Sequence, residues 1–75
     1  MMVETQVVRA GERPLAFVWK RRYLTVETVS DHWIEMGRWW EGENPLEFFL
    51  VFAEGGLFLL ARLLQGGRWH AKPVH

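Results

Sequence analysis

The feature that most constrains the fold of this chain is a pair of apolar segments on either side of Gly55–Gly56. Residues 47–53 and 57–64 carry aromatic or aliphatic side chains at almost every position. If both segments are strands, the two glycines supply the positive φ of a tight hairpin turn. One face of that hairpin then carries Phe48, Leu50, Phe52, Leu59, Ala61 and Leu63. The other face carries Val51, Ala53, Phe58 and Leu60.

The same segments can also be read as two short helices. Asn44 is a suitable cap for a helix with Pro45 at its first position, and the leucines and Arg62 of the second segment favour helix. Segments of about nine residues are short for helices, whereas the aromatic run 48–52 is typical of a strand. We therefore predict a hairpin with Phe52 opposite Leu59, and the helical alternative stays open for residues 57–64.

A second hairpin is predicted over residues 15–29. Apolar side chains alternate with others on both sides of Arg21–Arg22, the period-2 pattern of half-buried strands. With Trp19 opposite Leu24, the apolar residues gather on one core face. That face holds Phe17, Trp19, Leu24 and Val26. Because Arg21–Arg22 lacks the glycine or asparagine that a tight primed turn prefers, we expect a four-residue loop.

The rest of the chain completes a small, mostly β domain over residues 14–72. Turn residues and polarity define three further segments: an N-terminal arm or edge strand (1–13), a connector (30–44) with one helical turn at 30–37, and a last strand (68–72) after Gly66–Gly67. About five antiparallel strands result. A small SH3-like barrel or a bent meander is the expected way to close them around the tryptophans.

Composition narrows the classes of function. The 75 residues contain five tryptophans, five phenylalanines and no cysteine, so buried aromatic rings replace disulfides and thiolate metal sites as the source of stability. The formal net charge is zero, which argues against a strongly cationic module that binds nucleic acid by bulk charge. No apolar run reaches the length of a membrane span, and Met1 to Ala10 lacks the apolar stretch of a signal peptide. A cytoplasmic protein without membrane contact is expected.

The most distinctive polar stretch lies in the connector, where Arg38, Trp39 and Trp40 stand between two glycines. Adjacent indoles in a loop can stack on bases or sugars, with an arginine beside them for phosphate. Arg21 and Arg22 at the predicted hairpin tip could add further phosphate contacts. The alternative is that the indoles close one end of the barrel and that the arginines form a solvated turn.

Catalytic and metal-binding chemistry is not indicated. The single serine, Ser30, lies in no nucleophile motif, and no phosphate loop or dinucleotide fingerprint is present. The three histidines show no ligand spacing, so neither a metal nor a cofactor is expected. The carboxylates of the central region, Glu47 among them, are expected on strand exteriors and in the connector, where water solvates them. We therefore expect a protein that is not an enzyme.

Apolar residues on both faces of the 47–64 hairpin indicate an interface. An antiparallel sheet with one wet face should alternate, yet neither face of this hairpin is polar. A domain of this size has few elements with which to cover both faces, so one of them is predicted to pack on another chain. The simplest arrangement is a two-fold homodimer. The residues predicted for its interface are Phe48, Leu50, Phe52, Leu59 and Leu63.

Several spaced aromatic motifs together resemble a known family. They are Pro14–Arg22, Val29 with Trp33, Gly37–Trp40, Glu47–Phe49 with the following glycine-bearing hairpin, and a closing Trp69. This pattern, over residues 14–71, is similar to a small bacterial domain of unknown function, family 6504. Similar segments occur at the C-terminal end of the Y-family-polymerase-like subunit of the bacterial mutagenic translesion machinery. The resemblance implies association with DNA repair or with a polymerase complex, and it implies no catalytic residues.

Leu50, Leu59 and Leu63 stand at positions that are often polar in that family, which favours self-association of this chain. Two functions from different classes follow. The first is a non-enzymatic interaction module that self-associates and has a protein partner in DNA repair or translesion synthesis. The alternative is a weak single-stranded nucleic-acid-binding module that uses Trp39, Trp40 and the nearby arginines.

Overall fold

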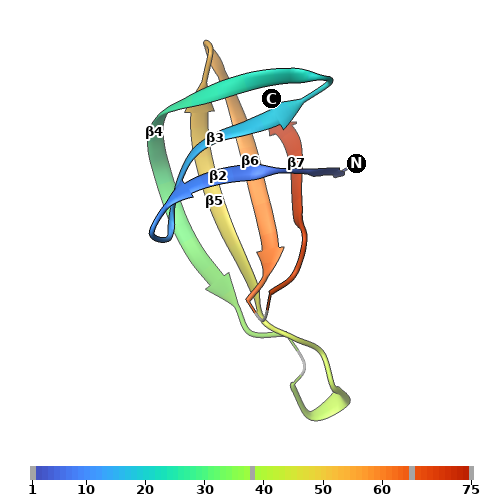
Figure 1. Cartoon of the computed structure of the whole chain (residues 1–75). Helices are drawn as coiled ribbons and strands as arrows, with labels where there is room; N and C mark the ends of the chain where they lie inside the picture. Colours follow the sequence, from blue (N-terminus) through green and yellow to red (C-terminus); the bar gives the residue numbers. More distant parts are fainter. Residues whose placement is uncertain (1, 38, 65, 75) are drawn as a thin grey trace.

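The protein is described by a computed structural model that covers residues 2–37, 39–64 and 66–74. Within these residues the elements in chain order are β1 (Val3–Thr5), β2 (Val7–Ala10), β3 (Arg13–Trp19), β4 (Arg22–Glu35), the 3₁₀ turn η1 (Trp39–Glu41), β5 (Leu46–Ala53), β6 (Gly56–Leu63) and β7 (Trp69–Val74). The strands pair antiparallel in the order β1-β7-β6-β5-β4-β3-β2. Together they form a sheet that curls into a half-barrel (Figure 1). The mostly β class is confirmed.

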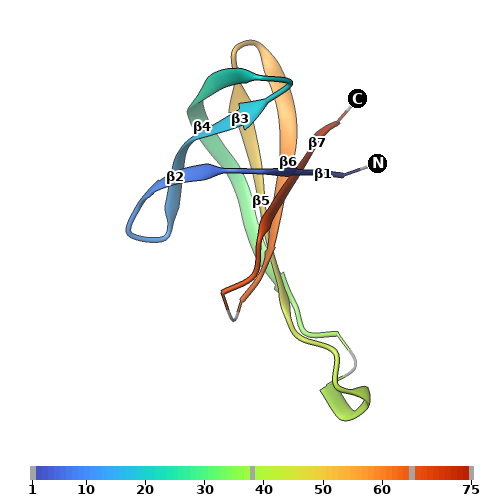
Figure 2. The same ribbon diagram turned by 45° about the vertical axis from the view of Figure 1, so that its right-hand side comes forward.

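The described strands number seven rather than the expected five because the N-terminal segment contributes two. β1 pairs with β7 and β2 pairs with β3, although only Gln6 separates them. The segment therefore crosses the open side of the half-barrel, from one end of the sheet to the other (Figure 2). Two hydrogen bonds hold it there: the Val18 amide donates to the Gln6 carbonyl at 3.1 Å, and the Thr5 hydroxyl donates to the Val18 carbonyl.

β4 is a single long strand that pairs with two different strands along its length. Its first residues pair with β3, and residues 26–35 pair with β5. The helical turn predicted at 30–37 is therefore wrong, since the chain stays extended to Glu35. The register shifts twice along β4, between Val26 and Thr28 and between Val29 and Asp31. Each bulge inserts one residue and interrupts the alternation, which explains why the sequence pattern resembled a connector.

The β3–β4 hairpin closes with a two-residue turn, and the four-residue loop predicted there is wrong. Lys20 and Arg21 occupy the turn with φ of 48° and 65°, and Trp19 pairs with Arg22. Positive φ at both central residues corresponds to a primed turn, whose twist matches that of the flanking strands. Leu24 consequently pairs with Phe17 instead of with Trp19, so the register differs from the predicted one by two residues. A shift of two keeps every side chain on its predicted face.

The β5–β6 hairpin shows the same kind of shift. Residues 57–64 are confirmed as mainly strand, and the turn is Glu54–Gly55 instead of Gly55–Gly56. Their φ values are 48° and 79°, so the turn again needs positive φ at both positions. Phe52 pairs with Leu57 rather than with Leu59. The division of the hairpin into two faces is as predicted, because the difference in register is again two residues.

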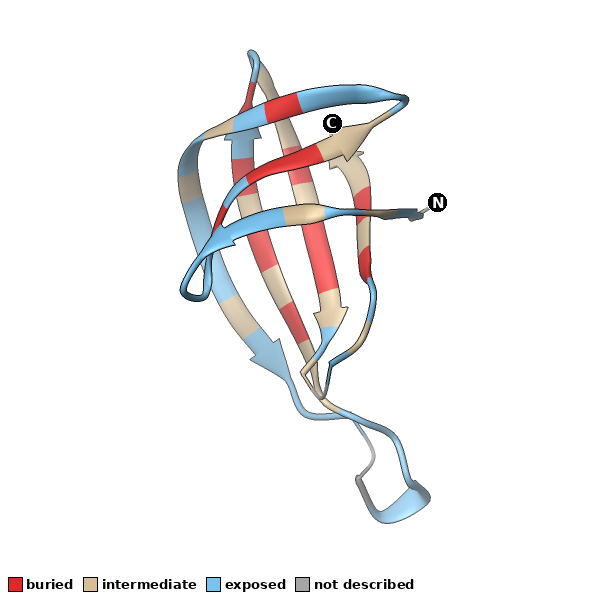
Figure 3. Ribbon diagram, in the orientation of Figure 1, coloured by how far each residue is buried: buried red, intermediate tan, exposed pale blue. Residues whose placement is uncertain are grey.

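The core lies inside the curl, between the β4–β7 sheet and the β2–β3 strands (Figure 3). Its buried members are Phe17, Leu24, Phe49, Val51, Ala53, Phe58, Leu60, Trp69 and Ala71, with Trp19 and Val26 packed against them. The predicted face of Phe17, Trp19, Leu24 and Val26 is thus confirmed as part of the core. Phe58 contacts Phe17 and Trp19 edge to face, with ring centroids 5.1 and 5.5 Å apart. Aromatic packing thus joins β6 to β3, which are not neighbours in the sheet.

Among the described residues, no helix has the length and the apolar character that crossing a membrane requires.

Candidate functional site

The candidate site is the side of the β4–β7 sheet that is turned away from β2 and β3, which we call the outer face. Its centre is a ladder of apolar cross-strand pairs between β5 and β6: Leu46 with Leu63, Phe48 with Ala61, Leu50 with Leu59, and Phe52 with Leu57. All five residues predicted for an interface, Phe48, Leu50, Phe52, Leu59 and Leu63, lie on this face. The intervening residues of both strands, such as Val51 and Leu60, point into the core and are fully buried.

No strand among the described residues lies over the apolar side chains of the outer face. Phe52 is 44% exposed and Leu63 is 39% exposed, while Phe48, Leu50 and Leu59 are half-buried by their neighbours within the sheet. Only Ala61 in the ladder is buried, because its methyl group is too short to rise above the larger residues around it. When one side of a sheet already packs against a complete core, a continuous apolar surface on its other side is typical of an interaction surface.

An aromatic stack extends the outer face onto β4. The rings of Trp33 and Phe48 lie nearly parallel, with centroids 5.3 Å apart and 15° between their planes. The two residues are directly opposed in the β4–β5 register. Stacked aromatic pairs across strands stabilise the sheet and hold both rings in defined positions. The apolar surface of the outer face therefore extends from β5 and β6 onto β4.

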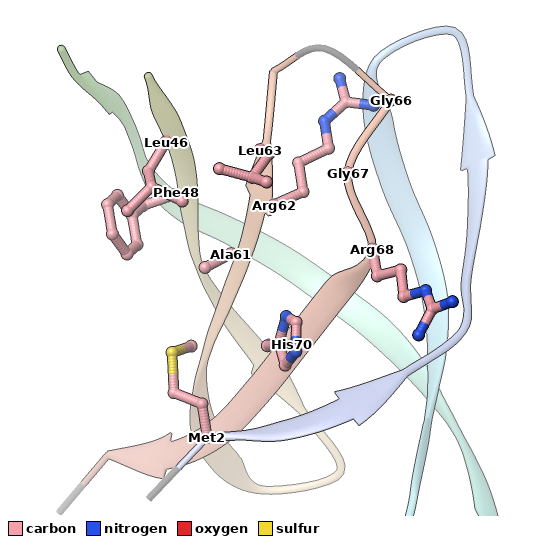
Figure 4. Close-up of a pocket in the computed structure, with 10 residues that line it drawn as sticks. All are labelled: Met2, Leu46, Phe48, Ala61, Arg62, Leu63, Gly66, Gly67, Arg68 and His70. Atoms are coloured by element: carbon pink, nitrogen blue, oxygen red, sulfur yellow. The ribbon is translucent and has the colours of Figure 1, made fainter. Parts of the chain in front are cut away.

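Near Ala61 the outer face is hollowed into an open groove of about 730 Å³ (Figure 4). Its lining consists of Met2, Leu46, Phe48, Ala61, Arg62, Leu63, Gly66, Gly67, Arg68 and His70. One rim is set by Gly67, whose amide donates to the Leu63 carbonyl at 3.1 Å. A Cβ on Gly67 would lie 2.2 Å from that of Leu63, so only glycine permits this close approach. The small side chain of Ala61 leaves space that a larger apolar group can fill.

Charged residues flank the apolar ladder on both sides, on β4 and on β7. On β4, Asp31 is directly opposite Leu50 and Glu35 is directly opposite Leu46. On β7, Lys72 is directly opposite Leu59 and His70 is directly opposite Ala61. The face thus carries two carboxylates on β4, an apolar centre and Lys72 on β7, and beyond β7 the Glu4 of β1 lies directly opposite His70. Lys72 forms no ion pair within the part of the chain that the structure describes.

On the inner face, three polar side chains form a compact cluster beside the core. Arg62 Nε donates to Glu47 Oε1, and His32 Nε2 donates to Glu47 Oε2, both at 2.7 Å. Glu47 is only 2% exposed, which corrects the expectation that this carboxylate is solvated. Burial disfavours its charged form, but hydrogen bonds from Arg62 and His32 and the charges of these groups outweigh the burial. The pKa of Glu47 therefore lies below its usual value.

Aromatic rings complete this polar cluster on two sides. The His32 ring stacks on Phe49 with centroids 4.2 Å apart, and the Arg62 guanidinium lies 4.9 Å from the centre of the Trp69 ring. These contacts hold both hydrogen-bond partners of Glu47 in place. The sequence analysis missed the cluster, although one indication was present. Glu47 and Arg62 are the charged residues within two otherwise apolar segments, and the hairpin register alone makes them partners.

Those residues predicted to bind nucleic acid that the structure describes lie at the two ends of β4. Arg21 is part of the β3–β4 turn, and Arg22 pairs with Glu54 at 3.0 Å. Trp40, which is 67% exposed, belongs to η1 beyond the other end of β4 (Figure 1). Trp39 is part of the same 3₁₀ turn, and Arg38 lies outside the described residues. The whole length of β4 therefore separates the paired tryptophans from the two arginines of the hairpin tip.

No group of three or more acidic, histidine or cysteine side chains that could hold a metal ion occurs in residues 2–37, 39–64 and 66–74.

The family of the chain is shown by a comparison with family models. The model described as Domain of unknown function (DUF6504) matches residues 2–64. This match covers most of the chain and confirms the family that the spaced aromatic motifs resemble. No curated protein and no solved structure matches the chain.

Proposed function

The chain belongs to this DUF6504 family, and we propose that it is a non-enzymatic interaction module that forms a homodimer through its outer face. The observation that carries the proposal is the apolar ladder between β5 and β6, which is unpacked on the outer face while the inner face of the same strands is a complete core. Each Å² of apolar surface removed from water contributes roughly 25 cal/mol, so covering such a ladder is a substantial driving force.

A second copy of the chain suits this surface better than a nucleic acid does. A phosphate backbone requires a positive surface, whereas the outer face carries both signs of charge at its edges and apolar side chains between them. The net charge of zero adds no long-range repulsion between copies. A surface with both signs and an apolar centre can be complementary to itself, as an isologous dimer requires.

The first experiment measures the mass of the protein by light scattering at high micromolar concentration. We expect twice the chain mass of 8.9 kDa for the natural sequence. Phe52→Lys places a charge on an exposed position of the outer face and should give a folded monomer. Tyr23→Lys is the matched control, because Tyr23 is a 60% exposed aromatic residue that pairs with β3, away from the outer face. This control should remain a dimer.

Two results would overturn the proposal. A monomer mass for the natural sequence would show that the outer face does not self-associate. A dimer mass that Phe52→Lys leaves unchanged, while circular dichroism shows an intact fold, would show that another surface forms the dimer.

A second variant distinguishes the two faces of β5. Val51→Lys should unfold the chain, because Val51 is completely buried on the inner face of the same strand.

The resemblance to a segment of the translesion machinery supports a second part of the proposal, that the dimer works in the cytoplasm beside a DNA-repair or polymerase complex. Affinity purification from the native host tests this part. We expect subunits of such a complex to be recovered with the natural sequence. Their recovery in equal amounts with an unrelated tagged control of the same size would contradict it.

A further inference from the structure

One row of side chains crosses the whole outer face and carries opposite charges at its two ends. Asp31 on β4 is directly opposite Leu50 on β5, Leu50 is opposite Leu59 on β6, and Leu59 is opposite Lys72 on β7. The row therefore consists of an acidic residue, two leucines and a basic residue. Asp31 is exposed and Lys72 is half-buried, so both can reach a second surface laid over the row.

We propose that the two-fold axis of the homodimer runs parallel to β5 and β6, so that Asp31 pairs with Lys72 of the partner subunit. This inference rests on the proposed self-association and specifies its geometry. In a face-to-face dimer the two-fold axis lies in the plane between the sheets. An axis along the strands places β4 of one copy over β7 of the other, and β5 over β6. The carboxylate of Asp31 and the ammonium group of Lys72 then meet on both sides of the interface.

The other simple arrangement, an axis across the strands, places each strand over its own copy. Asp31 and Glu35 would then face β4 of the partner, which carries the same two carboxylates, and Lys72 would face β7 of the partner, which carries the second Lys72. Like charges opposed across an interface are unfavourable, and opposite charges steer and orient association. The distribution of charge over β4 and β7 therefore selects the axis along the strands.

The sizes of the central side chains select the same axis independently. Phe48 and Ala61 are directly opposed across β5 and β6, and both line the groove of the outer face. With the axis along the strands, Phe48 of each copy lies over Ala61 of the partner subunit. A large ring then fills the space left by a methyl group, which is how facing layers of a core interdigitate. With the axis across the strands, the ring would lie over β5 of the partner, where larger side chains line the face.

Cysteine cross-linking tests the axis directly, because the natural chain contains no cysteine. Asp31→Cys and Lys72→Cys are prepared separately and treated with a short bismaleimide that spans the roughly 10 Å between packed sheets. With the axis along the strands, neither variant alone should form a covalent dimer, since equal positions lie about three strand spacings of ~4.8 Å apart sideways. A mixture of the two should form the covalent dimer.

Light scattering on the same samples separates failure of the axis from failure of the dimer. A covalent dimer from Asp31→Cys alone, or none from the mixture although light scattering shows a dimer mass, would overturn the axis and leave self-association intact. A monomer mass would overturn the proposed function and the axis with it. A mixture-specific covalent dimer is the supporting result.

Charge exchange gives a second readout without chemical modification. Asp31→Lys and Lys72→Asp should each weaken dimerisation by roughly tenfold, since each replaces two attractive pairs by repulsive ones. The double variant Asp31→Lys with Lys72→Asp should recover most of the loss, because it reverses both partners of the same pair. A double variant that dimerises no better than the single ones would contradict the pairing.

Discussion

Glu47 and Arg62 are directly opposed across β5 and β6, and their side chains form a 2.7 Å ion pair on the inner face, next to the apolar core. The pair is almost completely shielded, since the side chain of Glu47 is 3% exposed and that of Arg62 is 12% exposed. An ion pair in such surroundings contributes little when intact but leaves an uncompensated buried charge when one partner is removed. Its sensitivity to mutation and to pH is therefore testable.

The first prediction concerns Glu47→Gln. The variant leaves Arg62 without a counter-charge, and we expect it to lose on the order of 3 kcal/mol of unfolding free energy at pH 7. Because the pKa of Glu47 is lowered in the folded state, its contribution to stability is present above the unfolded pKa and is lost as the pH falls through the folded pKa. Urea unfolding between pH 7 and pH 3 should show a smaller acid-induced loss in Glu47→Gln than in the natural sequence.

Glu54→Gln is the control for that measurement, since Glu54 pairs with Arg22 at the surface. Its stability profile should stay close to that of the natural sequence, because exposed ion pairs contribute little. If Glu47→Gln and Glu54→Gln both follow the natural pH profile, the Glu47 carboxylate does not stabilise the fold.

The second prediction compares two aromatic residues of β3. Phe17 is fully buried and Trp19 is half-buried, and both contact the ring of Phe58. Phe17→Ala should cost about 3–5 kcal/mol, and Trp19→Ala should cost about 3 kcal/mol, at the lower end of that range. Thermal unfolding measures both. A melting temperature unchanged by Trp19→Ala would show that this indole is a surface residue.

The third prediction concerns the β3–β4 turn, where Lys20 and Arg21 both have positive φ. Replacing them by Asn and Gly supplies the residues that a primed turn prefers, and should raise the unfolding free energy by about 1 kcal/mol. Thr25→Gly is the control, since Thr25 is an exposed residue within β4. This control should lower stability by roughly 0.5–1 kcal/mol, because glycine weakens a strand interior. If both changes altered the unfolding free energy by the same amount and with the same sign, the positive φ of Lys20 and Arg21 would be contradicted.

The fourth prediction addresses the nucleic-acid alternative. Arg21 and Arg22 are separated from Trp40 by the length of β4, so these three residues cannot contact one short single-stranded nucleic acid at the same time. Titration of a fluorescent single strand at two salt concentrations should therefore show no salt-dependent binding. Binding that falls steeply with salt, and that is lost in both Trp40→Ala and Arg21→Glu, would favour the alternative over the proposed dimer.

The sequence alone was sufficient to assign the faces of the two hairpins. Leu50 and Phe52 were placed on the outer face and Val51 on the inner face although the predicted register was wrong by two residues. Side chains alternate with a period of two, so an error of two residues leaves every face unchanged. For the same reason, the apolar surface proposed for self-association could be recognised before the structure was known.

The tertiary structure decided what depends on partners distant in sequence. Ser30–Glu35 is extended because β5 lies beside it, and the two bulges of β4, between Val26 and Asp31, hide the alternation. Glu47 and Arg62 meet only in the true register, which is set by the Glu54–Gly55 turn, where the non-glycine residue Glu54 adopts positive φ. Such turns cost non-glycine residues energy, which the pairing of the attached strands repays. Local pattern therefore determined which side each residue faces, and long-range pairing determined which residues face one another.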